Sequence, residues 1–262
     1  MLVVGGGAAG LEAARVLATQ GHAVTIWESG TELGGVLAAI RGVDTVLDAQ
    51  RSWLLGEVAH LGVAIELGRT AASAAIVDAG FDDVIIATVA RWHGATVPGH
   101  DLPHVVTPTT LGEVLAPGAP AIENAAVVLG GGKPGLTLAT AFRSRGATVT
   151  IVEPTRVFGT ELGMPGRFRM VADAEAAGIV LVGEATLVEI TPDAVVVDVG
   201  DTRTKIPART VVVATRSVPN SPLVDELRTA CIAVHIVGDA REARGFEGIT
   251  RDAEDLARTL AI

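Results

Sequence analysis

The 262-residue sequence contains no tyrosine, a single cysteine, and no apolar run that approaches the ~18 residues of a membrane span. The single cysteine, Cys231, excludes a Cys-x-x-Cys redox pair and a cysteine-ligated iron–sulfur cluster within this chain. Because it precedes the apolar Ile232, we expect it to be a small buried side chain. Residues 1–20 do not read as a signal peptide, so the sequence predicts a cytoplasmic protein without a membrane span.

Basic charge is also scarce. The chain has 20 Lys and Arg against 30 Asp and Glu, a formal net charge of −10. This balance predicts that neither nucleic acid nor an anionic membrane surface is a partner. His100 and His104 lie four residues apart, but Pro103 opposes a helix that would place both on one face, so we predict no metal site.

The most informative stretch runs from Leu2 to Glu28. An apolar run stops at a glycine turn, a helical pattern follows, and a second apolar run ends in an acid. This order is typical of a dinucleotide-binding unit, in which the glycines admit a diphosphate to the N-terminus of the helix and the acid binds a ribose. The alternative is a similar fold whose glycines only shape the turn. The predicted contacts are Gly5, Gly7, Ala8, Ala9, Gly10 and Glu28.

A second copy of this motif spans residues 126–153. Each of its three glycines and its final acid lies 125 residues after its counterpart in the first copy. Two aligned copies, each between apolar runs, are much stronger evidence than one glycine triplet. The predicted contacts of this copy, for NAD(P) or ADP, are Gly130, Gly132, Lys133, Gly135 and Glu153.

The remaining pattern predicts an α/β fold with two Rossmann-like dinucleotide-binding domains, the second inserted in the first, and a small antiparallel meander. We expect the first domain to comprise residues 1–100 and 217–262, and the second residues 101–216. The meander is expected within residues 186–206, where polar and apolar residues alternate. Only residues 2–4 precede the first glycine turn, so either the first strand is clipped or this chain corresponds to the later part of something longer.

Several short pieces occur in an order that resembles the flavoproteins with two dinucleotide-binding domains. The resemblance covers nearly the whole chain and is greatest to the C-terminal flavoprotein part of the 2,4-dienoyl-CoA reductase, trimethylamine dehydrogenase and NADH:flavin oxidoreductase group. Beyond the two glycine motifs and their acids, the matching pieces are Gly34-Gly35, Ala87-Thr88, residues 98–105, Ala214-Thr215 and Gly238-Asp239.

The resemblance implies that FAD binds the first domain and that NAD(P)H is a co-substrate at the second. It adds Gly34, Gly35, Ala87, Thr88, Gly238 and Asp239 to the FAD contacts, with Asp239 on the ribityl chain or phosphate. In that group electrons pass to an iron–sulfur cluster and an FMN in a TIM barrel. Since this chain lacks the barrel and its cysteines, the resemblance implies a partner protein that carries FMN, an iron–sulfur cluster or both.

The leading hypothesis is therefore an FAD-dependent oxidoreductase module that takes hydride from NAD(P)H and passes electrons to a partner subunit or acceptor. No side-chain acid, base or nucleophile is required. Glu153 favours NADH, because its carboxylate repels a 2′-phosphate, although Arg156 lies close behind. Val89 and Arg216 replace glycines of the family and oppose close nicotinamide docking. The alternatives are a non-catalytic FAD- or ADP-binding structural subunit and a stand-alone flavin oxidoreductase.

Overall fold

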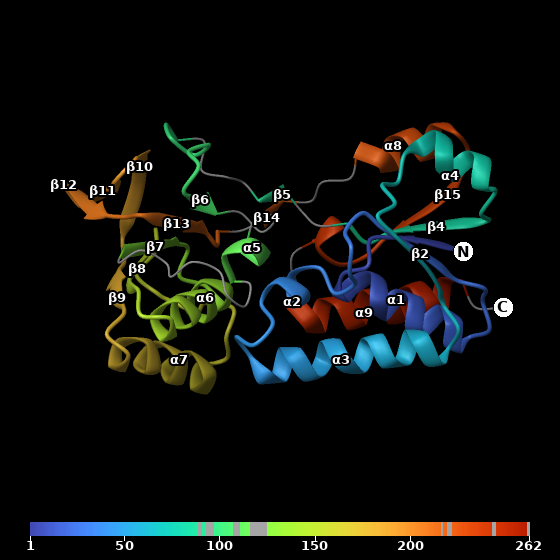
Figure 1. Cartoon of the computed structure of the whole chain (residues 1–262), viewed down its shortest axis with the longest axis horizontal. Coiled ribbons are helices and arrows are strands. Elements are labelled where there is room, and N and C mark those ends of the chain that lie inside the picture. The colour runs from blue at the N-terminus through green and yellow to red at the C-terminus, as the bar shows by residue number, and fades with distance from the viewer. Residues whose placement is uncertain are drawn as a thin grey trace. The chain divides into compact units, whose positions relative to one another are not determined.

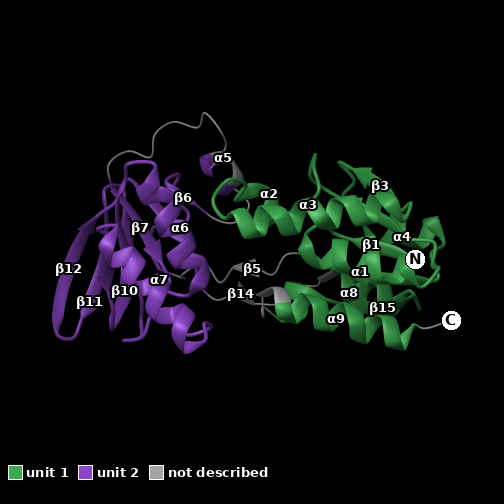
Figure 2. Cartoon of the chain, turned by 90° about the horizontal axis from the view of Figure 1, so that it is seen from below, with its two compact units in different colours: residues 1–91, 217–262 green, residues 92–216 purple. Residues whose placement is uncertain are grey.

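The computed structural model describes residues 1–88, 91–92, 97–106, 111–115, 125–215, 217–218, 222–242 and 245–260. The chain divides into two compact units, one formed by residues 1–91 and 217–262 and the other by residues 92–216 (Figure 2). A two-stranded pairing of β5 (Arg91–Trp92) with β14 (Ser217–Val218) lies where the chain passes from one unit to the other. Val89 and Arg216, the two departures from the family pattern, are outside the described residues.

The first unit is built on a five-stranded parallel sheet with the order β15-β4-β1-β2-β3, of which Figure 1 labels β15, β4 and β2. The order places β1 at the centre, so the residues that follow β1 lie at the carboxyl edge of the sheet, where α/β folds bind ligands. The strands are β1 (Leu2–Val4), β2 (Thr25–Glu28), β3 (Ala64–Leu67), β4 (Asp83–Ile86) and β15 (Ala233–Ile236).

Both faces of this sheet are covered because its central strands are apolar on both sides. Val3 and Ile85 pack into a core with α1, α3 and α9, whereas Leu2 and Val84 face the opposite core, which α4 and α8 complete. The helices are α1 (Ala8–Thr19), α2 (Val36–Ala39), α3 (Thr45–His60), α4 (Ser73–Ala79), α8 (Pro222–Thr229) and α9 (Gly245–Thr259), with a 3₁₀ turn, η1, at Gly238–Ala240.

The second unit also has a five-stranded parallel sheet, in the order β6-β13-β7-β8-β9. Its first two helices are α5 (Leu111–Leu115) and α6 (Lys133–Ser144), and α7 (Met164–Ala176) packs beside α6. The central strand β7 leads directly into the second glycine turn. The strands are β6 (Val105–Val106), β7 (Ala125–Leu129), β8 (Thr148–Val152), β9 (Val180–Val182) and β13 (Thr210–Val213).

A separate antiparallel sheet in the order β10-β11-β12 confirms the predicted meander. Its buried side chains, such as Val195 and Val197, share a core with Val127 and Val211 of the parallel sheet. The fold is therefore α/β, with Rossmann-like parallel sheets and a small antiparallel addition, as the sequence predicts. The three strands are β10 (Ala185–Thr191), β11 (Ala194–Val199) and β12 (Thr202–Pro207).

The expectation that Cys231 is buried is wrong. Cys231 is exposed and has a φ of +61°. It lies just after α8, and its N–H donates to the carbonyl of Arg228 at 3.0 Å, as a residue that ends a helix in the left-handed conformation does. Its apolar neighbour Ile232 packs against the core instead. No helix within the described ranges is both long enough and apolar enough to span a bilayer.

Candidate functional site

The first glycine turn joins β1 to α1, and its conformation requires glycine at both ends. Gly5 has a φ of +105°, and a methyl group there would lie 2.7 Å from the carbonyl oxygen of Ala87. A methyl group at Gly10 would collide with the carbonyl oxygen of Gly5. The absence of side chains at these two positions lets the helix lie close to the strands, as in a dinucleotide-binding turn.

The middle glycine, by contrast, faces open space. Gly7 is the N-cap of α1, and a methyl group there would meet nothing within 4 Å. No side chain among the described residues caps α1, and its first turn holds no acid. The N-terminus of the helix, at Ala8 and Ala9, therefore presents its N–H groups and the positive end of its dipole to an open face. This arrangement fits a diphosphate.

Glu28 is fixed beside this turn at the end of β2. Its Oε2 accepts a hydrogen bond of 2.6 Å from the N–H of Gly6, and its Oε1 accepts one of 2.6 Å from the N–H of Gly30. Short bonds from N–H groups to a carboxylate are strong and orient it. Oε1 also accepts from the hydroxyl of Ser29 at 3.2 Å, whereas Oε2 has a second lone pair with which Glu28 can accept from a hydroxyl group such as that of a ribose.

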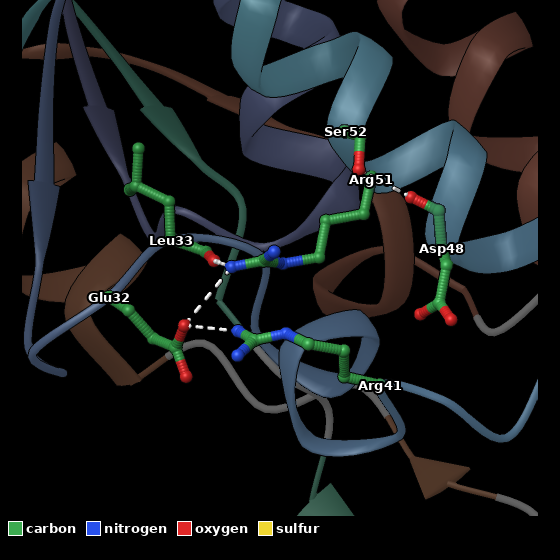
Figure 3. A network of polar contacts seen from close by, with 6 residues as sticks. All are labelled: Glu32, Leu33, Arg41, Asp48, Arg51 and Ser52. Carbon is green, nitrogen blue, oxygen red and sulfur yellow. Dashed lines mark hydrogen bonds and ion pairs between the residues drawn. The ribbon is translucent and has the colours of Figure 1, made fainter.

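The loop after Glu28 returns to the glycine turn. The N–H of Gly34 donates to the carbonyl of Gly6 at 2.8 Å, and a methyl group at Gly35 would lie 3.1 Å from Cα of Gly7. Arg51 of α3 holds this loop through the carbonyl of Leu33, at 2.9 Å, and through Glu32, at 3.1 Å (Figure 3). Arg41 is the second partner of the Glu32 carboxylate, at 2.5 Å.

Ala87 and Thr88 lie next to the same turn. The N–H of Ala87 donates to the carbonyl of Val4 at 2.9 Å, which continues the pairing of β4 with β1. The carbonyl of Ala87 is the group that a side chain at Gly5 would strike. The sequence-predicted pair is therefore brought to the carboxyl edge of the sheet together with the glycine turn.

Gly238 and Asp239 approach the N-terminus of α1 from the other end of the chain. Gly238 has a φ of +63°, and a methyl group there would collide with Cβ of Ala9. Asp239 is half-buried, and the loss of solvent raises the pKa of its carboxyl group. Asp239 therefore directly follows a residue, Gly238, that lies against Ala9 at the N-terminus of α1, where the diphosphate is predicted to bind.

Asp252 is a site residue that the sequence reasoning missed. Its side chain on α9 is 1% exposed; Oδ2 accepts from the N–H of Gly238 at 2.9 Å, and Oδ1 pairs with Arg241 at 2.8 Å. It thus fixes the turn that carries Asp239. The signal was available, because Asp252 lies three residues after Ile249 and four before Leu256, on the apolar face of the predicted helix.

The second glycine turn repeats the first, 125 residues later. Gly130 has a φ of +109°, and a methyl group there would lie 2.5 Å from the carbonyl oxygen of Ala214; one at Gly135 would collide with the carbonyl of Gly130. Glu153 accepts from the N–H of Gly131 at 2.7 Å and from the N–H of Thr155 at 3.0 Å. The backbone geometry that suits a diphosphate is therefore present twice.

The two turns differ at their middle glycine. A methyl group at Gly132 would collide with Oε1 of Glu161, and Oε2 of the same side chain accepts from the N–H of Lys133 at 3.2 Å. A carboxylate therefore fills the face of Gly132 that is open at Gly7. Elsewhere, no group of three or more His, Cys, Asp or Glu within the described residues is arranged to hold a metal ion.

A family model described as pyridine nucleotide-disulphide oxidoreductase matches residues 1–242. Among known proteins, the chain is 30% identical over 246 residues to a bilirubin reductase of Mediterraneibacter gnavus, a match that covers 92% of this chain and 37% of that protein. It is also 30% identical over 247 residues to an NADH oxidase of Thermoanaerobacter brockii, covering 92% of this chain and 38% of that protein.

Solved structures share the fold. A 2-naphthoyl-CoA reductase in complex with 2-naphthoyl-CoA matches 96% of this chain and 38% of its own, with a TM-score of 0.85 and 23% identity. Histamine dehydrogenase from Rhizobium sp. 4-9 matches 100% of this chain and 41% of its own, with a TM-score of 0.83 and 21% identity. The chain thus spans about two fifths of the length of these relatives.

The family model, the relatives and the two glycine turns all indicate a protein of the FAD/NAD(P) oxidoreductase type. The redox-active cysteine pair that the family description implies is absent here, because Cys231 is the single cysteine in the sequence. The family binds FAD and NAD(P)H, and several relatives are reductases by name. The chain belongs to the pyridine nucleotide-disulphide oxidoreductase family, a family of FAD/NAD(P) oxidoreductases.

Proposed function

We propose that this chain is a reductase module that binds FAD in its first unit, takes hydride from a pyridine nucleotide at its second, and passes electrons to a partner subunit or acceptor. The observation that carries the proposal is the open face of Gly7 at the N-terminus of α1, next to a fixed carboxylate, Glu28. Bound FAD supplies the chemistry, by accepting a hydride and releasing electrons onward.

In this proposal the chain positions the cofactor and contributes no reacting side chain. The diphosphate lies against the N-terminal N–H groups of α1, and the adenosine ribose donates its hydroxyl hydrogens to Glu28. Asp239 accepts from the ribityl chain or lies near the phosphate. The residues proposed to hold FAD are Gly5, Gly7, Ala8, Ala9, Gly10, Glu28, Gly34, Gly35, Ala87, Thr88, Gly238 and Asp239.

The second turn is proposed to hold the pyridine nucleotide, with NADH preferred over NADPH. The carboxylate of Glu153 accepts from the N–H groups of Gly131 and Thr155, and the proposal puts the 2′-position of the adenosine ribose beside it. A fixed negative charge there repels a phosphate but accepts from a ribose hydroxyl. The relative named NADH oxidase supports the same preference. The proposed contacts are Gly130, Gly132, Lys133, Gly135 and Glu153.

We further propose that the electrons leave for a protein partner with FMN, an iron–sulfur cluster or both, in a TIM-barrel part. Two facts support this. The relatives are two to three times as long as the matched region, and the chain itself has one cysteine, too few to ligate a cluster.

The test is a visible absorption spectrum of the purified chain before and after anaerobic addition of NADH. A yellow protein whose flavin bands bleach with NADH, and more slowly with NADPH, is the expected result. A flavin that stays oxidised under an excess of both nucleotides would refute the reductase proposal. As a control, Glu153→Gln is expected to retain the flavin but to reduce the difference between the rates at which NADH and NADPH bleach it.

A second candidate function is a nucleotide-binding structural subunit without turnover. The position of Glu161 against Gly132 favours it, because a carboxylate there opposes a nucleotide at the second turn. A colourless protein that binds ADP would support this candidate, and bleaching of bound flavin by NADH would eliminate it.

A further inference from the structure

We propose that Glu161 is a built-in occupant of the second diphosphate cradle, and that a pyridine nucleotide binds there only by displacing its carboxylate. The inference rests on the proposed function, because it concerns the affinity of the proposed nucleotide turn. In this proposal Glu161 lowers the affinity of the second turn for its nucleotide. The first turn, which has no such carboxylate, retains FAD, whereas the second turn binds and releases a co-substrate.

The contacts of Glu161 are those of a bound anion. Oε2 accepts from the N–H of Lys133, at the first turn of α6, and Oε1 lies against Cα of Gly132 so closely that a methyl group there would collide with it. Gly132 caps α6 without a side chain of its own. A carboxylate at this place is favoured by the positive end of the helix dipole, in the way that a phosphate would be.

The first unit serves as an internal comparison, since the two turns share their backbone hydrogen bonds. The N–H of Gly34 donates to Gly6 at 2.8 Å, and the N–H of Gly159, 125 residues later, donates to Gly131 at 2.7 Å. The position that corresponds to Glu161 is therefore Val36. Valine has no group that binds the N-terminus of a helix, and Gly7 stays open.

The loop that carries Glu161 is fixed, so only its side chain has to move. Arg167 of α7 donates to the carbonyls of Gly159, Thr160 and Leu162 at 3.1, 3.2 and 3.3 Å. Arg167 thus takes the place that Arg51 has in the first unit (Figure 3). The difference is that the acid of the first loop, Glu32, is paired with two arginines, Arg41 and Arg51.

Glu161 is exposed, and this limits the strength of its hold. A carboxylate at a solvent-exposed helix terminus contributes modestly, and salt screens the contribution. A diphosphate therefore displaces it, but the negative charge remains close by and lowers the affinity. We expect Glu161 to weaken nucleotide binding by about 3- to 10-fold at low salt.

The experiment compares ADP binding by calorimetry to the FAD-loaded wild type and to Glu161→Gln, with Glu175→Gln as the matched control. Glu175 is exposed on α7 in the same unit and loses the same charge. We expect Glu161→Gln to lower the Kd for ADP by about 3- to 10-fold, and Glu175→Gln to leave it unchanged. The gain should shrink at 1 M salt, where the Debye length falls to about 3 Å.

Glu161→Ala provides a second variant, because it removes the occupant altogether and should also tighten ADP binding. If both variants bind ADP with the wild-type Kd, the inference is refuted. Its failure is distinguishable from that of the proposed function: a bound flavin that stays oxidised under an excess of NADH and NADPH would overturn the reductase proposal, whereas the ADP titration of the same FAD-loaded protein would still report on Glu161.

Discussion

The buried carboxylate of Asp252 provides the sharpest test of how the first unit holds its cofactor turn. In Asp252→Ala, the N–H of Gly238 loses its partner in a buried place, which costs about 1–3 kcal/mol. The ion pair with Arg241 is also lost, but the Arg241 side chain is 54% exposed and finds water, so this loss adds only about 0–1 kcal/mol.

Together these losses predict that Asp252→Ala lowers the free energy of unfolding by about 2 kcal/mol. This is a lower estimate, because Asp252 makes a further interaction. For a chain of this size the change corresponds to a fall in Tm of about 4–8 °C. Calorimetry or circular dichroism on the flavin-free protein measures it, and a flavin titration measures the accompanying loss of FAD affinity.

Asp255→Ala is the matched control on the same helix. The Asp255 side chain is 52% exposed and pairs with Arg258 on the surface, so its loss should change Tm by about 2 °C or less. Equal melting temperatures for the two variants would refute the claim that the Asp252 carboxylate supports the Gly238 turn.

Three further changes test the site. Gly7→Ala should leave the Tm of the flavin-free protein unchanged but abolish FAD retention on gel filtration, because the new methyl group occupies only the space proposed for the diphosphate. The control is Gly56→Ala in the middle of α3, where a methyl group also meets no neighbour; this variant should retain FAD. Glu28→Gln should weaken FAD binding about 10-fold in a flavin titration, since two backbone N–H groups lose a charged acceptor. Burial raises the pKa of Asp239, so the stability that its protonated carboxyl contributes to the flavin-free protein should be lost as pH rises from about 4; urea denaturation of Asp239→Asn should lack this contribution to the pH dependence.

The sequence alone predicts the glycine turns well, because their chemistry is local. A turn that brings a helix against a strand excludes side chains at Gly5 and Gly10, and this exclusion leaves a visible pattern in the chain. The 125-residue offset extends the same reasoning to the second unit, where Gly130 and Gly135 meet the corresponding carbonyl and strand groups.

Features that depend on tertiary placement could not be predicted in this way. Glu161 lies 29 residues beyond Gly132 in a loop without periodicity, so nothing in the sequence places its carboxylate against that glycine. Cys231 is exposed because helix α8 ends there in a left-handed turn, which its apolar neighbour did not indicate. Asp252 stood on an apolar helix face, and only the fold identifies Gly238 as its partner.

The discontinuity of the first unit has a consequence for its synthesis on the ribosome. Strand β15 pairs with β4, yet the whole of residues 92–216 separates them in the chain. Until residues 233–236 leave the exit tunnel, β4 forms the unfinished border of a four-stranded sheet with open hydrogen-bonding groups. The second unit is continuous, and all of its residues are synthesised before β15. It can therefore fold before the first unit, whose sheet is complete only after β15 has been synthesised.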